Sequence, residues 1–163
     1  MNRAVFLDRD GVINRKGGSY YVFREEDFVL NEGVTDALKY FESKGYLLII
    51  VTNQGGIARG VFTVEQLENL NSYMTGILKS SGITLSGIFY CPHHPEVSAC
   101  ECRKPGTLLF EISVKEYDID PGKSFMIGDS QSDMIAAERM GIKGILLTVN
   151  GNMMQEIVLA GKI

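Results

Sequence analysis

Two aspartates, Asp8 and Asp10, stand one residue apart between an apolar run (residues 4–7) and Gly11. A short apolar run is typical of a buried strand, so both carboxylates are expected at the carboxyl tip of that strand. Carboxylates this close repel each other unless a cation neutralises them. Mg²⁺ prefers carboxylate and phosphate oxygens, so the pattern predicts a magnesium site suited to phosphoryl chemistry.

The two aspartates can divide the work of moving a phosphoryl group. Asp8 comes first off the strand and is the better candidate for a nucleophile that forms an aspartyl-phosphate. Asp10 points the same way in an extended chain and could act as the acid/base. Asp129 follows a later apolar run and offers a further carboxylate to Mg²⁺, while Asp10 could ligate through its backbone carbonyl alone.

Other segments offer groups that could bind phosphate. Thr52 supplies a hydroxyl, the glycines at 55 and 56 allow backbone N–H groups to approach, and Lys104 supplies a positive charge. Asp133 lies four residues after Asp129, one helical turn on. It could hold Lys104, hold a metal-bound water, or be an ordinary aspartate on a helix face.

A separate group of soft ligands lies within twelve residues: Cys91, His93, Cys100 and Cys102. Two pairs of such ligands suit tetrahedral Zn²⁺, and four protein ligands leave no open position, so the site should be structural. His94 is an alternative ligand, but His93 repeats the Cys-x-Cys spacing. Because all three cysteines lie in this loop, metal binding is favoured over disulfides.

Strand and helix patterns alternate along the chain, which predicts an α/β fold: a three-layer α/β/α sandwich with a mainly parallel, Rossmann-like sheet. The chain is expected to form a single domain (residues 1–163) with a zinc-binding loop at 91–102. Ligands bind beyond the carboxyl ends of strands in such sheets, where all the polar groups named above are expected. Strands are expected at 3–7, 46–51, 87–90, 124–128 and 144–149, and helices at 34–44, 63–82, 106–117 and 131–140.

Composition limits the classes of function. The chain has 163 residues, 45% apolar and 22% charged, with a net charge of −4. The sequence has no block of basic residues, which argues against a nucleic-acid-binding groove. The longest apolar run, residues 46–51, is far too short to span a bilayer. No signal peptide is apparent. We therefore expect a cytoplasmic protein with neither nucleic-acid nor membrane partners.

Taken together, the motifs resemble those of the haloacid dehalogenase (HAD) phosphatase superfamily. Its four motifs match residues 6–11, 51–54, 103–105 and 126–133 in order. The similarity is greatest to the branch that holds histidinol-phosphatases and D-glycero-D-manno-heptose 1,7-bisphosphate phosphatases, which carries a Cys-x-His…Cys-x-Cys zinc loop. The resemblance implies Asp8 as nucleophile, Asp10 as acid/base, Thr52 and Lys104 as phosphoryl stabilisers, and Mg²⁺ held by Asp8, Asp10 and Asp129. It also implies a monomer. The segments between the motifs are too short for a large cap domain, so none is expected.

Residues 55–63 and 90–95 resemble the heptose enzymes, which implies hydrolysis of the 7-phosphate of a small phosphorylated sugar, heptose 1,7-bisphosphate. The length of the zinc loop is nearer to histidinol-phosphatases, so histidinol phosphate is the alternative substrate. Less favoured are a polynucleotide 3′-phosphatase and a non-catalytic, zinc-stabilised binding module. The residues expected to contact substrate are Arg9, Lys16, Gly17, Gly18, Ser19, Asn53, Gln54, Gly55, Arg59, Arg103 and Ser130.

Overall fold

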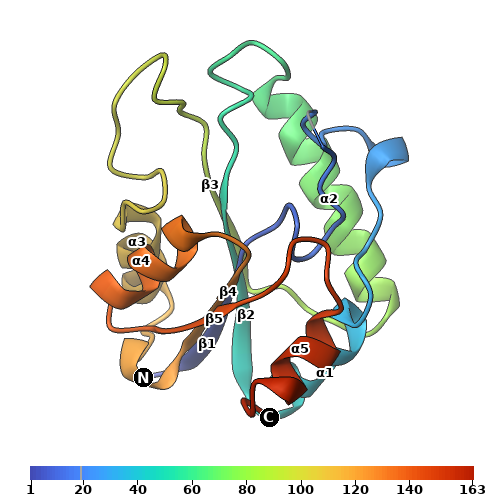
Figure 1. Ribbon diagram of the computed structural model, residues 1–163, viewed down its shortest axis with the longest axis vertical. Coiled ribbons are helices and arrows are strands. Elements are labelled where there is room, and N and C mark those ends of the chain that lie inside the picture. Colours follow the sequence, from blue (N-terminus) through green and yellow to red (C-terminus); the bar gives the residue numbers. More distant parts are fainter. Residues whose placement is uncertain (19) are drawn as a thin grey trace.

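The computed structural model of the chain describes residues 1–18 and 20–163. Within these ranges five strands form one sheet, in the order β3-β2-β1-β4-β5, and every neighbouring pair is parallel (Figure 1). β1 is the central strand, so residues that follow it lie in the middle of the sheet edge. The strands are β1 (Arg3–Leu7), β2 (Tyr46–Asn53), β3 (Gly87–Cys91), β4 (Phe125–Gly128) and β5 (Lys143–Leu146).

Helices cover both faces of the sheet, as expected for crossovers between parallel strands. One apolar core lies between one face of the sheet and α1 (Val34–Ser43), α2 (Val64–Ser80) and α5 (Met153–Leu159). The other core packs α3 (Leu108–Glu116) and α4 (Gln131–Arg139) against the opposite face. Alternate residues of β1 enter the two cores, Val5 the first and Phe6 the second. The three-layer α/β/α architecture is therefore confirmed.

Local sequence signals explain where the helices begin. Thr63 and Gln66 form a reciprocal capping box at the start of α2, as their spacing predicted. Ser130 and Asp133 form a second capping box at α4. The helix expected at 106–117 begins at Leu108, and the last strand is shorter than the predicted 144–149. α5 was not predicted; Asn152 caps it, and Met153 and Ile157 bury its inner face.

The long connections gather at the carboxyl ends of the strands. Figure 1 shows the segment after β1 and the loop after β3 at this end of the sheet, opposite the chain's two termini. Within the described ranges these connections contain the short 3₁₀ turn η1 (Glu25–Asp27) and no inserted cap domain, whereas the turn η2 (Pro121–Lys123) lies at the opposite edge, just before β4. These loops therefore form the walls of any cavity above the sheet.

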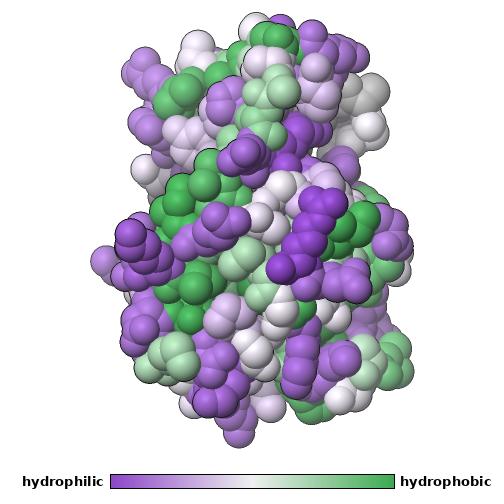
Figure 2. Space-filling model, turned by 90° about the vertical axis from the view of Figure 1, so that its left-hand side faces the viewer, coloured by the Kyte–Doolittle hydropathy of each residue, from purple (hydrophilic) through white to green (hydrophobic). Residues whose placement is uncertain are grey.

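The outer face over α3 and α4 alternates between hydrophobic and hydrophilic side chains (Figure 2). Ile112 of α3 and Ile135 of α4 are exposed there. In the described parts of the chain, no helix has both the length and the apolar character required to cross a membrane.

Candidate active site

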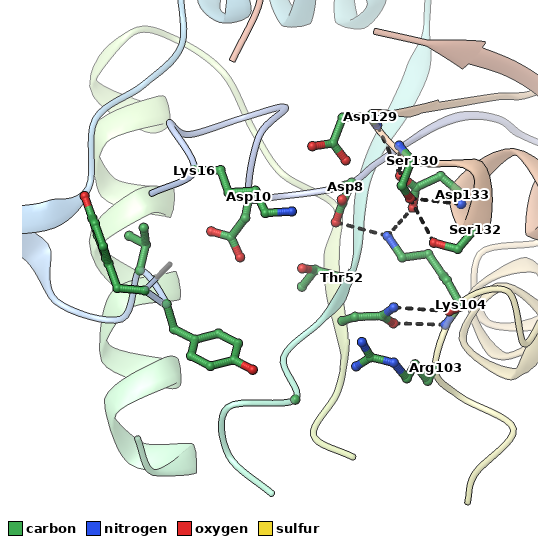
Figure 3. A pocket seen from close by; sticks show the side chains of 15 residues that line it. Asp8, Asp10, Lys16, Thr52, Arg103, Lys104, Asp129, Ser130, Ser132 and Asp133 are labelled. Atoms are coloured by element: carbon green, nitrogen blue, oxygen red, sulfur yellow. Dashed lines mark hydrogen bonds and ion pairs between the residues drawn. The ribbon is translucent and has the colours of Figure 1, made fainter. Parts of the chain in front are cut away.

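A cavity of about 270 Å³ opens at the carboxyl edge of the sheet (Figure 3). Four segments far apart in the sequence meet there because each follows the tip of a parallel strand, as predicted. The residues that line the cavity are Asp8, Asp10, Lys16, Tyr20, Tyr21, Val22, Thr52, Asn53, Gly55, Arg103, Lys104, Asp129, Ser130, Ser132 and Asp133.

A buried lysine lies between two of the carboxylates. The Lys104 ammonium nitrogen is 3.0 Å from Asp8 Oδ1 and 2.6 Å from Asp133 Oδ1, and it donates a 2.8 Å hydrogen bond to the carbonyl of Val51. Asp133 Oδ2 accepts hydrogen bonds from the backbone N–H of Asp129 and Ser130. Among the roles considered for Asp133, the structure therefore shows that of holding Lys104 in place.

Burial and the neighbouring ammonium of Lys104 shift the pKa of Asp8 in opposite directions. Desolvation raises the pKa of Asp8 to about 7, although Lys104 lowers it; the charges of Asp133 and Asp129 add to the rise. The pKa of Asp129 is raised, first by burial and then by Asp133, against the opposing effect of Lys16. A bound cation would favour the ionised form of both carboxyl groups.

These carboxylates suit a hard divalent ion. One oxygen each of Asp8, Asp129 and Asp133 lies within 4.8 Å of the others. Among the described residues, Asp129 Oδ2 is buried and has no hydrogen-bond partner. A buried carboxylate oxygen without a donor is costly, and a cation would satisfy it. Gly11 makes room for this oxygen, because its φ is +87° and a Cβ there would collide with the Asp129 carboxylate.

The carboxylate of Asp10 is held apart from that group. Arg9 donates to Asp10 Oδ1 from Nε (3.2 Å) and Nη2 (2.9 Å), and Asn14 donates to the same oxygen (3.0 Å). Gln54 Nε2 donates to Asp10 Oδ2 (3.0 Å). Because these hydrogen bonds engage the side chain of Asp10, its backbone carbonyl is the group that remains for a metal. This agrees with the predicted ligation through the backbone carbonyl, which stays a prediction.

The expected substrate contact of Arg9 is not what the structure shows. Arg9 is fully buried, and its guanidinium also donates to the carbonyl of Val22 at 2.6 Å. Its side chain does not line the cavity. The reason is electrostatic: a buried guanidinium requires a carboxylate partner, and the neighbouring Asp10 provides one.

The segment Thr52–Gln54 divides its tasks among three side chains. Thr52 lines the cavity. The Asn53 amide forms two hydrogen bonds with the backbone of Lys104: Nδ2 donates to the carbonyl (3.3 Å), and Oδ1 accepts from the N–H (2.9 Å). Gln54 is buried outside the cavity lining and reaches Asp10 and Thr52 instead. Gln54 was expected to bind substrate directly, whereas here it contacts two other site residues.

Most of the other predicted substrate contacts lie at the cavity wall. Lys16, Gly55, Arg103 and Ser130 line it. Gly17 and Gly18 are not among the lining residues, and Arg59 lines a neighbouring cavity with Tyr21, whose hydroxyl accepts a 3.4 Å hydrogen bond from Arg59. The predicted contact Ser19 lies outside the described residues.

The four predicted zinc ligands converge on one point beside this cavity. The Sγ atom of Cys91 is 3.6 Å from that of Cys100 and 2.9 Å from that of Cys102, and His93 Nδ1 is 3.1 Å from Cys102 Sγ. A tetrahedral Zn²⁺ with Zn–S bonds of about 2.3 Å places its sulfur ligands about 3.8 Å apart, so the donor set fits with small adjustments. His94 faces away, and its Nδ1 accepts from the Glu96 N–H.

The cysteine cluster directly adjoins the cavity. Arg103 follows Cys102, and its Nη1 donates to the carbonyl of His93 at 3.3 Å. Gly55 allows the two segments to meet, since a Cβ there would lie 2.9 Å from the His94 ring and 3.0 Å from Arg103 Nη1. The geometry of the loop thus controls where Arg103 points.

Several lining or supporting residues were missed by sequence reasoning. Tyr20, Tyr21 and Ser132 line the cavity. Asn14 supports Asp10, and Asn150, between β5 and α5, exchanges hydrogen bonds with the backbone of Lys16 at 2.6 and 3.1 Å. The two tyrosines lie just after the Lys-Gly-Gly segment, so the sequence could have indicated that they contribute to the site. Isolated asparagines in loops, such as Asn14 and Asn150, give no such indication.

The fold and this arrangement of acidic residues and lysine define a HAD-like hydrolase. A family model described as HAD-hydrolase-like matches residues 101–159. The crystal structure of D,D-heptose 1,7-bisphosphate phosphatase from B. bronchiseptica, complexed with magnesium and phosphate, superposes with a TM-score of 0.84 at 30% identity, covering 98% of this chain and 87% of that one.

Curated relatives narrow the class to one family. The D-glycero-β-D-manno-heptose-1,7-bisphosphate 7-phosphatase of Haemophilus ducreyi is 46% identical over 155 residues, covering 91% of this chain and 84% of the relative. The Helicobacter pylori (strain J99) enzyme of the same name is 44% identical, covering 91% and 85%. The chain therefore belongs to the heptose-1,7-bisphosphate 7-phosphatase family of HAD-like hydrolases.

Proposed function

We propose that this chain is a Mg²⁺-dependent phosphatase that removes the 7-phosphate of D-glycero-β-D-manno-heptose 1,7-bisphosphate through an aspartyl-phosphate. The observation that carries the proposal is the Asp8 carboxylate, 3.0 Å from the buried Lys104 ammonium and close to Asp129, at the floor of a cavity of about 270 Å³. The relatives' names favour the β-anomer.

In the first step, an Asp8 carboxylate oxygen attacks phosphorus and the bond from phosphorus to the sugar oxygen breaks. Asp10 gives its proton to that oxygen, so the sugar leaves as an alcohol. In the second step, Asp10 takes a proton from water as the water oxygen attacks phosphorus. The bond to Asp8 then breaks and phosphate is released, which regenerates both carboxyl groups.

Charge on the transferring group is balanced by fixed donors. The Lys104 ammonium is preorganised by Asp133 and the Val51 carbonyl, so it need not rearrange as negative charge develops. Thr52 adds a hydroxyl on the cavity wall. Asp8 and Asp129, with the backbone carbonyl of Asp10, would hold Mg²⁺, which when bound supplies charge neutralisation and orients the phosphate.

The second phosphate of the substrate requires positive charge away from the nucleophile. Lys16 and Arg103 line the same cavity and are the candidates for this contact. Arginine suits two-pronged binding of phosphate oxygens, so Arg103 is the stronger of the two. A substrate with a single phosphate and an amine would leave this charge unused, which disfavours histidinol phosphate.

We further propose that Cys91, His93, Cys100 and Cys102 bind a structural Zn²⁺. Support comes from the close approach of the four donor atoms on an extended loop and from the link between Arg103 and the His93 carbonyl. Zinc would rigidify the loop and hold Arg103 at the cavity mouth. A single domain that acts as a cytoplasmic monomer completes the proposal.

The function is tested by comparing kcat/KM with Mg²⁺ for the α- and β-anomers of heptose 1,7-bisphosphate, fructose 1,6-bisphosphate and histidinol phosphate. The Asp8→Asn variant serves as the blank. We expect the β-heptose substrate to lead by about 100-fold or more, which corresponds to about 2.7 kcal/mol of transition-state binding. Preference for histidinol phosphate would contradict the proposal.

A further inference from the structure

Gln54 forms a bridge between two groups that must act on the same phosphate. Its side-chain Nε2 donates one hydrogen bond to Asp10 Oδ2 and another to Thr52 Oγ1, each 3.0 Å long. Only 1% of Gln54 is exposed, and its backbone N–H is fixed to the carbonyl of Cys91 at 2.8 Å. The amide is therefore held rigidly at the tip of β2.

The bond to Thr52 has a directional consequence. The Thr52 oxygen accepts from Gln54, so its own O–H hydrogen is turned away from Gln54. Thr52 is buried and lines the cavity. Its hydrogen is thereby available to a phosphoryl oxygen rather than to the neighbouring amide.

The bond to Asp10 has a second consequence. Arg9 and Asn14 donate to Oδ1 from the loop that follows β1, and Arg9 Nη2 also donates to Oδ2 at 3.1 Å. Gln54 adds a hydrogen bond to Oδ2 from the tip of β2. A carboxylate fixed at both oxygens cannot rotate freely about its terminal bond. Gln54 thus ties the orientation of the acid/base to the strand that carries the phosphate-binding hydroxyl.

We propose that Gln54 is a positioning residue that aims the Asp10 carboxyl group at the leaving-group oxygen and the Thr52 hydroxyl at the transferring phosphoryl group. This inference rests on the proposed phosphatase function. It assigns Gln54 no contact with substrate, in agreement with its place outside the cavity lining. Proton transfer still runs between Asp10 and the sugar oxygen; Gln54 exchanges no proton.

A comparison of two kinds of ester separates this role from a merely structural one. The leaving group of an alkyl phosphate is a strongly basic alkoxide, which needs a proton from Asp10. The leaving group of p-nitrophenyl phosphate is a stable phenolate, which needs little assistance. The ratio kcat/KM reports the steps up to release of the leaving group. A misdirected Asp10 therefore affects the alkyl ester far more than the aryl ester.

The experiment measures kcat/KM for heptose 1,7-bisphosphate and for p-nitrophenyl phosphate in wild type, Gln54→Met and Gln54→Glu. Gln155→Leu, at an exposed position on α5, is the control. We expect Gln54→Met to lose about 100-fold on the alkyl ester and about tenfold or less on the aryl ester. On an Asp10→Asn background, Gln54→Met should add no further loss specific to the alkyl ester.

Equal losses on both esters, or no loss in either Gln54 variant, would overturn the inference. Gln54→Glu keeps the side-chain size but places a carboxylate oxygen against Asp10. If the methionine variant folds poorly, the same comparison of the two esters is made with Gln54→Glu. If the wild type hydrolyses another alkyl phosphate but not heptose bisphosphate, the proposed substrate fails. The Gln54 inference is then tested on that other alkyl ester.

Discussion

Replacing Lys104 with methionine would leave the buried carboxylate of Asp133 and the largely buried carboxylate of Asp8 without their shared cation. Lys104 is 3% exposed, and its ammonium lies 3.0 Å from Asp8 and 2.6 Å from Asp133. Methionine has a similar length but carries no charge. In the Mg²⁺-free protein, the substitution tests directly how much of the local structure depends on this cation.

The expected cost follows from the loss of a buried partner. Removing one member of a buried ion pair typically destabilises a protein by about 3–5 kcal/mol. For a chain of this size, that lowers the melting temperature by roughly 6–20 °C. Burial already raises the pKa of Asp8 to about 7 despite Lys104, so the pKa should rise further without it. The stability penalty should therefore be largest at pH 8 and shrink at pH 5, where Asp8 takes up a proton.

The measurement is urea unfolding of the dialysed protein at pH 5 and pH 8, without chelator so that any bound zinc is retained. Lys115→Met, at an exposed position on α3, is the control and should stay within about 0.5 kcal/mol of wild type. The Asp8→Asn/Lys104→Met double variant should recover part of the loss. A Lys104→Met penalty below about 1 kcal/mol at pH 8, or one that grows at pH 5, would refute the reasoning.

Three further substitutions test separate parts of the site. Asn53→Ala removes both side-chain bonds to the Lys104 backbone and should lower kcat about tenfold or more, measured by phosphate release; an unchanged kcat would contradict the positioning of Lys104 by Asn53. Asp129→Asn should raise the Mg²⁺ concentration for half-maximal activity at least tenfold, and an unaltered Mg²⁺ titration would remove Asp129 from the metal site. Cys100→Ser should bring zinc, measured by mass spectrometry, from one ion per chain towards none and lower the melting temperature; full zinc retention would argue against the cluster.

The fold followed from the sequence because its strands are short, apolar and separated by helical patterns, one of which opens with the capping box of Thr63 and Gln66. Phe6 and Val51 belong to continuous buried runs, which indicate strands covered on both faces. α5 was missed because its seven residues give too few turns for helical periodicity to be recognised. Its packing against α1 is a tertiary effect that no local pattern reports.

The location of the site was also predictable, since every polar motif follows a strand tip. The tasks of individual side chains were not. Arg9 and Gln54 stand next to residues that face the cavity, so sequence alone could not separate a substrate contact from a supporting contact. Their direction is set by burial and by hydrogen bonds between segments, as in the link from Gln54 on β2 to Asp10 beyond β1.

The central claim is that the chain removes the 7-phosphate and retains the anomeric phosphate of the heptose substrate. ³¹P NMR of D-glycero-β-D-manno-heptose 1,7-bisphosphate with Mg²⁺ and enzyme follows both phosphates at once. The account predicts loss of the C7 phosphomonoester signal, a matching gain of inorganic phosphate and an unchanged C1 signal, with no reaction in Asp8→Asn. Release of the C1 phosphate, or persistence of both signals with active protein, would contradict it.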